Sequence, residues 1–135
     1  MGLDKEEEIA VLYALYQCGG KGSKARIIFY VTENHLLKAR EGDEAVRRTG
    51  ETSFENDLAW ARQNLKEKGE ISMPKHGVWQ IIEKGRERLF RAANAVFNCK
   101  PDEDWFVRYA QKLIDELFQL GEKLATIASA ATQPK

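Results

Sequence analysis

The fold is decided by residues 52–82, which read TSFENDLAWARQNLKEKGEISMPKHGVWQII. The segment opens with the capping-box pattern Thr52-Ser53-Phe54-Glu55, in which a hydroxyl and a carboxylate satisfy the first backbone donors of a helix. Apolar residues then recur at helical spacing along one inward face: Phe54, Leu58, Ala61 and Leu65. Gly69 supplies the left-handed stop that ends many helices. The first half of the segment therefore predicts a helix with well-marked ends.

After Gly69 the apolar residues recur at every second position, as they do in a strand. The two candidate strands are Glu70-Ile71-Ser72-Met73 and Val78-Trp79-Gln80-Ile81-Ile82, joined by the turn Pro74-Lys75-His76-Gly77. Trp79 alternates inward, and we expect Trp60 of the preceding helix to pack near it in the core. Because an isolated hairpin is only marginally stable, these strands must pack on helices.

Helical patterns lie on both sides of this segment. Upstream, one helix carries apolar residues from Ile9 to Tyr16 and ends at Gly19-Gly20, and Ser23 can cap a second helix. The apolar side of that second helix is expected to use Ala25, Ile28, Phe29 and Val31. Downstream, helices are predicted over residues 84–98 and 102–129. The expected core consists of Ile9, Leu12, Tyr16, Ile28, Phe54, Leu58, Leu65, Trp79, Ile81 and Leu89.

Three helices followed by a hairpin is the element order of a winged helix-turn-helix. The sequence thus predicts a mainly α fold with a small β-hairpin, a winged helix-turn-helix plus a long C-terminal helix. We divide it into a winged-helix domain over residues 1–99 and a C-terminal helical extension over residues 100–135.

A closer likeness rests on spaced matches within the deciding segment and just after it: Phe54-Glu55-Asn56, Trp60-Ala61, Leu65-Lys66, Gly69, Gly77-Val78-Trp79-Gln80-Ile81 and Gly85-Arg86. In these residues the chain resembles the N-terminal winged-helix domain of Mrr-type restriction proteins, over roughly residues 5–90. The likeness has no counterpart for residues 100–135. It implies a role in DNA binding.

A helix-turn-helix places its recognition helix in the major groove, where each base pair presents a distinct set of donors and acceptors. With Phe54 inward, the far side of the predicted recognition helix carries Asn56, Ala59, Gln63, Lys66 and Glu67. Asn and Gln side chains can pair with adenine, Ala59 permits close approach, and Lys66 can meet a phosphate. Any solvated helix face carries such residues, so this assignment depends on the fold.

Further basic and hydroxyl residues are expected on the same side of the domain. They lie in the polar segment 38–51, at the start of the recognition helix, at the start of the second helix and at the wing tip: Arg47, Arg48, Ser53, Ser23, Lys24, Lys75 and His76. Helix N-termini favour phosphate oxygens, and arginine suits both phosphate and guanine. The predicted DNA-binding set comprises these seven residues together with Asn56, Ala59, Gln63 and Lys66.

The preferred function is double-stranded DNA binding, as a transcriptional regulator or as the DNA-targeting component of a restriction or defence system. Because Mrr-type proteins act on methylated DNA, the resemblance also implies a modified base as a target. The alternative is a winged-helix adaptor that binds protein and no nucleic acid. Zero net charge, from 21 basic and 21 acidic residues, suits that alternative, as do Glu51, Glu55 and Asp57 around the recognition helix.

Patterns for catalysis and metal binding are missing from the sequence. The resemblance implies that Mrr-type proteins carry their nuclease in a separate domain, with a metal-binding acid and an acid-x-Lys pair, and no Glu-x-Lys occurs here. The four soft metal ligands, Cys18, His35, His76 and Cys99, lack zinc-site spacing. We therefore expect no enzyme activity, no metal and no cofactor. In a restriction system, a separate nuclease subunit would supply the cleavage.

The expected location is the cytoplasm. No apolar run reaches the ~20 residues of a membrane span, so we expect no contact with a membrane. The start of the chain is acidic where a signal peptide would be basic and then apolar. Two cysteines far apart match no disulfide framework, and reduced thiols are typical of the cytoplasm.

The last predicted helix carries an unbroken heptad seam, with alternating steps of four and three: Phe106, Ala110, Leu113, Leu117, Leu120, Leu124 and Ile127. Such a seam favours left-handed helix pairing. We expect a homodimer through Leu113, Leu117, Leu120, Leu124 and Ile127, with Trp105 and Tyr109 facing the domain. The alternative is packing of this seam on helices of the same chain. Pairing by a two-fold axis would set two recognition helices about 34 Å apart, which suits a palindromic site.

Overall fold

In a computed structural model, residues 6–37, 53–98 and 104–132 are described, and over these residues the chain forms five helices and three strands. In chain order the elements are α1 (Glu6–Gln17), β1 (Lys21–Ser23), α2 (Lys24–Glu33), α3 (Ser53–Glu67), β2 (Ile71–Lys75), β3 (Val78–Ile81), α4 (Glu83–Asn98) and α5 (Asp104–Thr132). The expected mainly α fold with a small β-hairpin is confirmed. Across the same residues no helix is both long enough and apolar enough to cross a membrane.

The sheet contains one strand more than the sequence predicts. β2 and β3 form the expected hairpin, and Gly77 in their turn has a φ of 79°, which glycine adopts readily. β1 pairs antiparallel with β3 and gives the strand order β1-β3-β2. Its sequence, Lys-Gly-Ser, has no apolar alternation, so the hydrophobic pattern could not reveal it.

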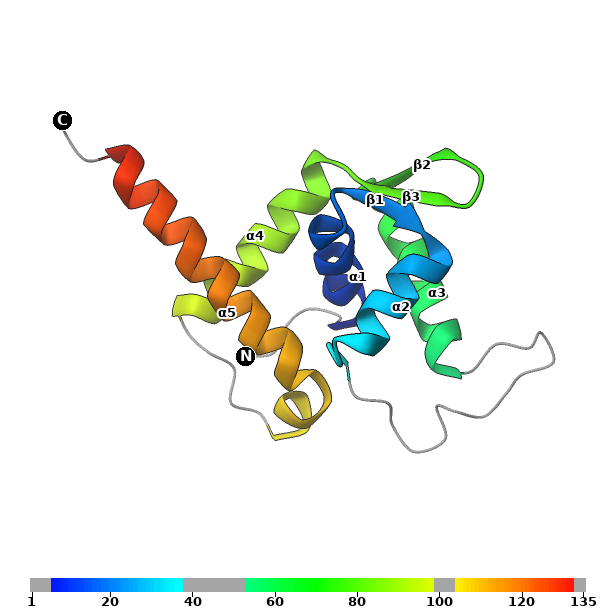
Figure 1. Ribbon diagram of the computed structural model, residues 1–135, viewed down its shortest axis with the longest axis horizontal. Helices are drawn as coiled ribbons and strands as arrows, with labels where there is room; N and C mark the ends of the chain where they lie inside the picture. Colours follow the sequence, from blue (N-terminus) through cyan, green and yellow to red (C-terminus); the bar gives the residue numbers. More distant parts are fainter. Residues whose placement is uncertain (1–5, 38–52, 99–103, 133–135) are drawn as a thin grey trace.

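Helix α1 lies at the centre of the domain, in contact with α2, α3 and α4 (Figure 1). Every residue from Ile9 to Leu15 is buried, so α1 is covered on all sides rather than along one stripe. The prediction of a buried position is confirmed for Ile9, Leu12, Leu58, Leu65, Trp79, Ile81 and Leu89. Tyr16 and Ile28 are half-buried against this core, and the side chain of Phe54 lies outside the described residues.

Helix α2 buries only part of the predicted face: Val31 is buried and Ile28 is half-buried as expected, but Ile27 replaces Ala25 and Phe29. Ile27 and Val31 are fully buried, whereas Ala25 is exposed and Phe29 is 65% exposed. Ile27 lies against β1, because a Cβ added at Gly22 would sit 3.1 Å from the Ile27 Cδ1 atom. The packing of α2 on the unpredicted strand therefore agrees with a helix turned by about one residue, roughly 100°.

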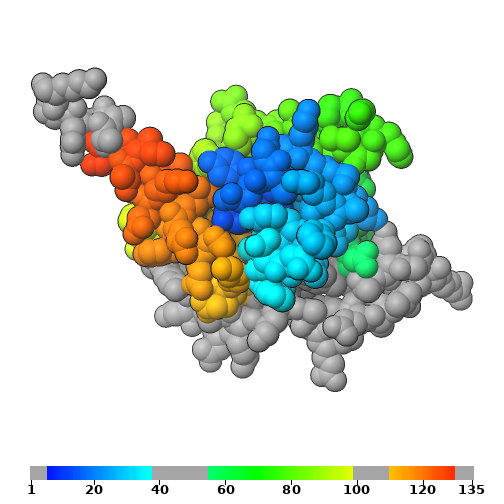
Figure 2. Space-filling model, viewed as in Figure 1, coloured from blue at the N-terminus to red at the C-terminus, as the bar shows by residue number. Residues whose placement is uncertain are grey.

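Helices α4 and α5 cross closely at Gly121. A Cβ added there would lie 2.6 Å from the Cβ atom of Phe97 and closer still to the carbonyl oxygen of Ala93, so the crossing has room only for glycine. Within α5, Ala110 has non-helical backbone angles, with φ −124° and ψ 27°. The last turns of α5 extend away from the rest of the molecule (Figure 2).

The heptad seam of α5 packs mostly inside the chain. Leu113 and Leu117 are fully buried and Leu120 is 6% exposed, so the expectation that these three face a partner is wrong. The physical reason is that α1 and α4 also have apolar surface to cover, and α5 shares one core with them. Leu124 is half-buried and Ile127 is 59% exposed. Two side chains expected to face the domain lie outside the described residues: Trp105 and Tyr109.

Candidate nucleic-acid interface

An open pocket lies on the outer side of α3 and is lined by residues of that helix. The pocket has a volume of ≈ 490 Å³ and is lined by Asn56, Ala59, Trp60, Arg62, Gln63 and Glu67. Three of the predicted base-contacting residues, Asn56, Ala59 and Gln63, are thus brought together. Lys66 is exposed on the same helix. We call this set of pocket-lining residues the α3 stripe.

Trp60 belongs to the α3 stripe and not to the core, contrary to the sequence-based expectation. Its side chain is 63% exposed, whereas that of Trp79 is 2% exposed, as expected. Arg62 takes the place predicted for Trp60, since its guanidinium carbon lies 5.6 Å from the centroid of the Trp79 ring. At about 100° per residue, Trp60 falls only about 40° from Asn56 on the helix circumference. That angle, read from the sequence, would have placed Trp60 on the outer side.

Hydrogen bonds arrange the polar side chains of the α3 stripe. Arg62 Nη1 donates to Gln63 Oε1 at 3.2 Å, and Gln63 Nε2 donates to Glu67 Oε1 at 3.2 Å. The same Arg62 nitrogen lies 3.8 Å from the sulfur of Met73 on β2, so Arg62 joins α3 to the hairpin. The Gln63 amide is therefore held within the stripe by one acceptor and one donor contact, and a second N–H and a second oxygen lone pair remain for a base.

The β2–β3 hairpin and the start of α2 meet across the sheet. Val78 of β3 pairs with Lys75 of β2 on one side and with Ser23 of β1 on the other. Lys75 and His76 are exposed at the turn of the hairpin. Ser23 caps α2 as predicted, because its hydroxyl oxygen accepts a hydrogen bond of 3.2 Å from the Arg26 backbone N–H.

Several predicted residues cannot be placed on this surface. Arg47 and Arg48 lie outside the described residues, and so does the side chain of Ser53, although α3 begins at Ser53. Lys24, the first residue of α2, is half-buried. The structure therefore brings together the α3 stripe, and separately the turn of the hairpin and the start of α2, with Arg62 as the link from α3 to the hairpin.

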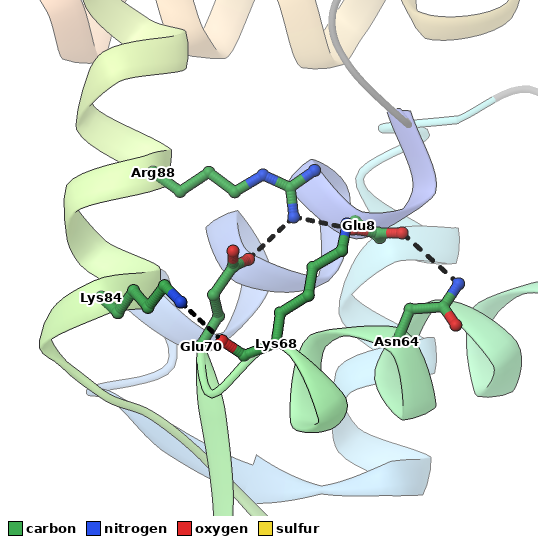
Figure 3. Close-up of polar contacts among 6 residues, drawn as sticks. All are labelled: Glu8, Asn64, Lys68, Glu70, Lys84 and Arg88. Carbon is green, nitrogen blue, oxygen red and sulfur yellow. Dashed lines mark hydrogen bonds and ion pairs between the residues drawn. The ribbon is translucent and has the colours of Figure 1, made fainter.

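A buried ion cluster fixes the C-terminal end of α3 against α1 and α4 (Figure 3). Arg88 Nη1 of α4 lies 2.7 Å from an oxygen of Glu8 on α1 and 2.7 Å from an oxygen of Glu70, which follows α3. Lys68 Nζ lies 2.8 Å from the same Glu8 oxygen, and Asn64 Nδ2 donates to the other Glu8 oxygen at 3.5 Å. The Glu8 carboxylate of α1 thus contacts groups from α3, from the turn after α3 and from α4.

Burial and pairing act in opposite directions on the Glu8 carboxyl. Burial raises its pKa, but hydrogen bonds and positive charge from Lys68 and Arg88 outweigh burial, and the resulting pKa lies below the usual value of 4.5. Glu8 is therefore a buried carboxylate that remains charged at neutral pH. Because its partners come from α3, the turn after α3 and α4, the Glu8 carboxylate ties α1 to both helices.

Within the described part of the chain, no three His, Cys, Asp or Glu side chains gather as a metal site would require.

The fold and the α3 stripe together define a small mainly α domain in which a β-hairpin follows the third helix. Residues 8–91 match the family model described as the Mrr N-terminal domain, and the chain belongs to this family. The matched domain is related to restriction systems and is not a catalytic nuclease domain. No curated protein and no solved structure matches the chain.

Proposed function

We propose that this chain binds double-stranded DNA through a winged-helix domain, as a transcriptional regulator or as the DNA-targeting component of a restriction system. The observation that carries the proposal is the α3 stripe, where Asn56, Ala59 and Gln63 share one open pocket on the outer side of the helix. Amide side chains at such positions suit the donor and acceptor pattern of adenine in the major groove. Membership of the Mrr N-terminal domain family supports the same conclusion.

Binding to random duplex at several salt concentrations tests this function. Each phosphate neutralised by the protein contributes about −0.9 to the slope of log affinity against log salt. Lys66→Ala should weaken binding to all sequences alike and should reduce the slope by about one contact. Lys123→Ala is the matched control, since Lys123 is equally an exposed lysine but lies on α5. An identical slope for Lys66→Ala and the wild type would remove Lys66 from the interface.

Asn56→Ala separates base reading from phosphate binding. A bidentate contact between Asn56 and a base contributes about 1–3 kcal/mol to discrimination, so its loss should relax base preference in a selection from a random duplex library. The library should also contain methylated duplexes, because a modified base is part of this proposal. An unchanged preference profile for Asn56→Ala would contradict the assignment.

A protein-binding adaptor is the second candidate, and a specific observation favours it. Trp60 is 63% exposed, and Glu67 lines the same pocket, so the outer side of α3 combines an apolar ring with an acid. Such a surface also suits a protein partner. If no binding to random or methylated duplex is measurable near ~50 mM salt, the adaptor replaces DNA binding as the function.

We further propose that the chain forms a homodimer through the end of α5. Among the seam residues whose side chains are described, Leu124 and Ile127 are the two that are left partly or largely exposed. Light scattering at micromolar concentration should give a dimeric mass, and Leu124→Asp with Ile127→Asp should give a monomer. Leu117→Asp is unsuitable as a test because Leu117 is fully buried. A monomeric wild type would overturn this proposal.

The proposal includes the absence of catalysis. A DNA-targeting component needs no nuclease of its own, and in a restriction system a separate subunit would cut the DNA. The expected location is the cytoplasm. Metal-dependent cleavage by the purified chain, abolished by a single carboxylate substitution, would overturn the assignment as a non-enzyme.

A further inference from the structure

Trp60 is exposed at the centre of the surface that the proposed function turns toward DNA. Its indole is 63% exposed and lines the same open pocket as Asn56 and Gln63, four residues before it and three residues after it. Ala59, a small residue in the same pocket, leaves space beside the ring. An indole exposed to water presents apolar surface, and removing that surface from water is favourable in free energy. A partner that covers the Trp60 ring would therefore bind more tightly.

Duplex DNA offers few apolar partners to a helix in the major groove. The base faces are stacked on one another, so an indole has no free base face on which to stack in an intact duplex. The base edges carry hydrogen-bonding groups, and their apolar group is the methyl at C5 of thymine. The polar neighbours of Trp60 point to the same base pair type, because Asn and Gln side chains make bidentate hydrogen bonds to adenine.

We propose that Trp60, with Ala59 beside it, contacts the C5-methyl group of a thymine, while Asn56 or Gln63 binds an adenine of the same or the adjacent base pair. This inference rests on the proposed function, since it requires α3 to enter the major groove. The proposed ligand is therefore an A·T-containing step, in which Trp60 contacts the thymine and an amide side chain contacts the adenine. A methyl group at C5 of cytosine has the same position and chemistry, and the experiment separates these two sources.

Removing the methyl group from the DNA tests the contact directly. Uracil differs from thymine only by that methyl, so labelled duplexes of alternating dA-dT and of alternating dA-dU should differ in affinity for the wild type. Burying one methyl group is worth about a fourfold change in affinity, so the thymine duplex should bind at least about fourfold more tightly. Anisotropy titrations measure both dissociation constants under the same salt conditions.

The variant arm assigns the difference to Trp60. For Trp60→Ala the two duplexes should bind equally, and for Trp60→Phe, which keeps a smaller ring, part of the preference should remain. Phe29→Ala is the matched control, because Phe29 is exposed to 65% but lies on α2 outside the pocket. A thymine preference that survives in Trp60→Ala would overturn the proposal even if the protein binds DNA well.

The remaining outcomes are also decisive. If the wild type prefers alternating dG-dC with methylated cytosine over the unmethylated form but ignores the difference between thymine and uracil, thymine is excluded as the ligand. Equal binding of all four duplexes overturns the contact of Trp60 with a methyl group and leaves DNA binding intact. Absence of binding to every duplex overturns both this inference and the proposed function.

Discussion

Replacing Arg88 by methionine tests whether the buried ion cluster stabilises the domain. Methionine keeps an unbranched apolar stem but removes the charge that lies 2.7 Å from both Glu8 and Glu70. Glu8 is 1% and Glu70 5% exposed, so both carboxylates have little contact with water that could compensate for the lost partner. Glu8 would retain Lys68 at 2.8 Å, whereas Glu70 would lose this ion pair. The variant therefore leaves buried negative charge with less compensation.

The expected loss follows from this geometry. Removing one partner of a buried ion pair costs about 3–5 kcal/mol in free energy of unfolding. At about 4 °C per kcal/mol for a domain of this size, Tm should fall by about 12–20 °C. Urea unfolding at pH 7, followed by circular dichroism, measures the free energy, and a thermal melt measures Tm.

Two further variants make the measurement specific. Arg86→Met removes an exposed arginine two residues away on the same helix and should change the free energy of unfolding by about 0.5 kcal/mol or less. Adding Glu70→Gln to Arg88→Met removes one uncompensated charge and should restore part of the loss. If Arg88→Met is as stable as Arg86→Met, the buried ion cluster does not stabilise the domain.

Two predictions concern other contacts. The pKa of Glu8 in the folded protein lies below 4.5, so the contribution of its ion pairs to stability is complete above pH 4.5 and is lost as the pH falls through the folded pKa. Urea midpoints measured from pH 7 to pH 3 should therefore decline below about pH 4.5. Glu8→Gln should make that decline smaller. Gly121→Ala should reduce the free energy of unfolding by about 1–3 kcal/mol, since the added Cβ meets Ala93 and Phe97. Alanine favours a helix over glycine by about 1 kcal/mol, so a more stable Gly121→Ala protein would contradict the close crossing of α4 and α5.

The elements that the sequence predicts well are those whose signals are local. The bounds of α3 follow from residues adjacent in the chain, from a helix start at Ser53 to the left-handed Gly69 with its φ of 74°. The hairpin follows from the alternation around Val78 and from the turn at Gly77. Short-range hydrogen bonds and side-chain periodicity set these features, and both can be read in a window of a few residues.

The features that were missed depend on distant residues. β1 exists because β3 pairs with it across more than fifty positions, and α2 packs on β1. The ion pair of Glu8 with Arg88 joins residues 80 positions apart. Such pairings are set by tertiary packing, which a pattern in one segment does not contain. Trp60 is different, because its angle on the α3 wheel gave a local signal that outweighs the general tendency of tryptophan to be buried.

The part of the candidate site that the sequence predicts is the part set by local helical geometry. Asn56, Ala59 and Gln63 share one side of α3 by helical geometry alone, and the structure brings them to one pocket. Glu67 joins them by the same geometry, whereas the position of Arg62 in that pocket depends on Met73 and Trp79 of the hairpin, which local periodicity cannot supply. Contacts to DNA, and the roles given to Arg47 and Arg48, stay predictions.

Helix α4 links the proposed dimer contact to the proposed DNA-binding helix. At one end it crosses α5 at Gly121, so closely that the two helices cannot slide past each other without opening the contact of Gly121 with Ala93. Toward its other end Arg88 is tied to Glu8 and to Glu70, which directly follows the last turn of α3. A second chain bound at the end of α5 would therefore be held at a fixed orientation to α3 by packed side chains and a buried ion cluster. Since two recognition helices must match half-sites about 34 Å apart, this rigidity is what a dimeric reader of a palindromic site needs.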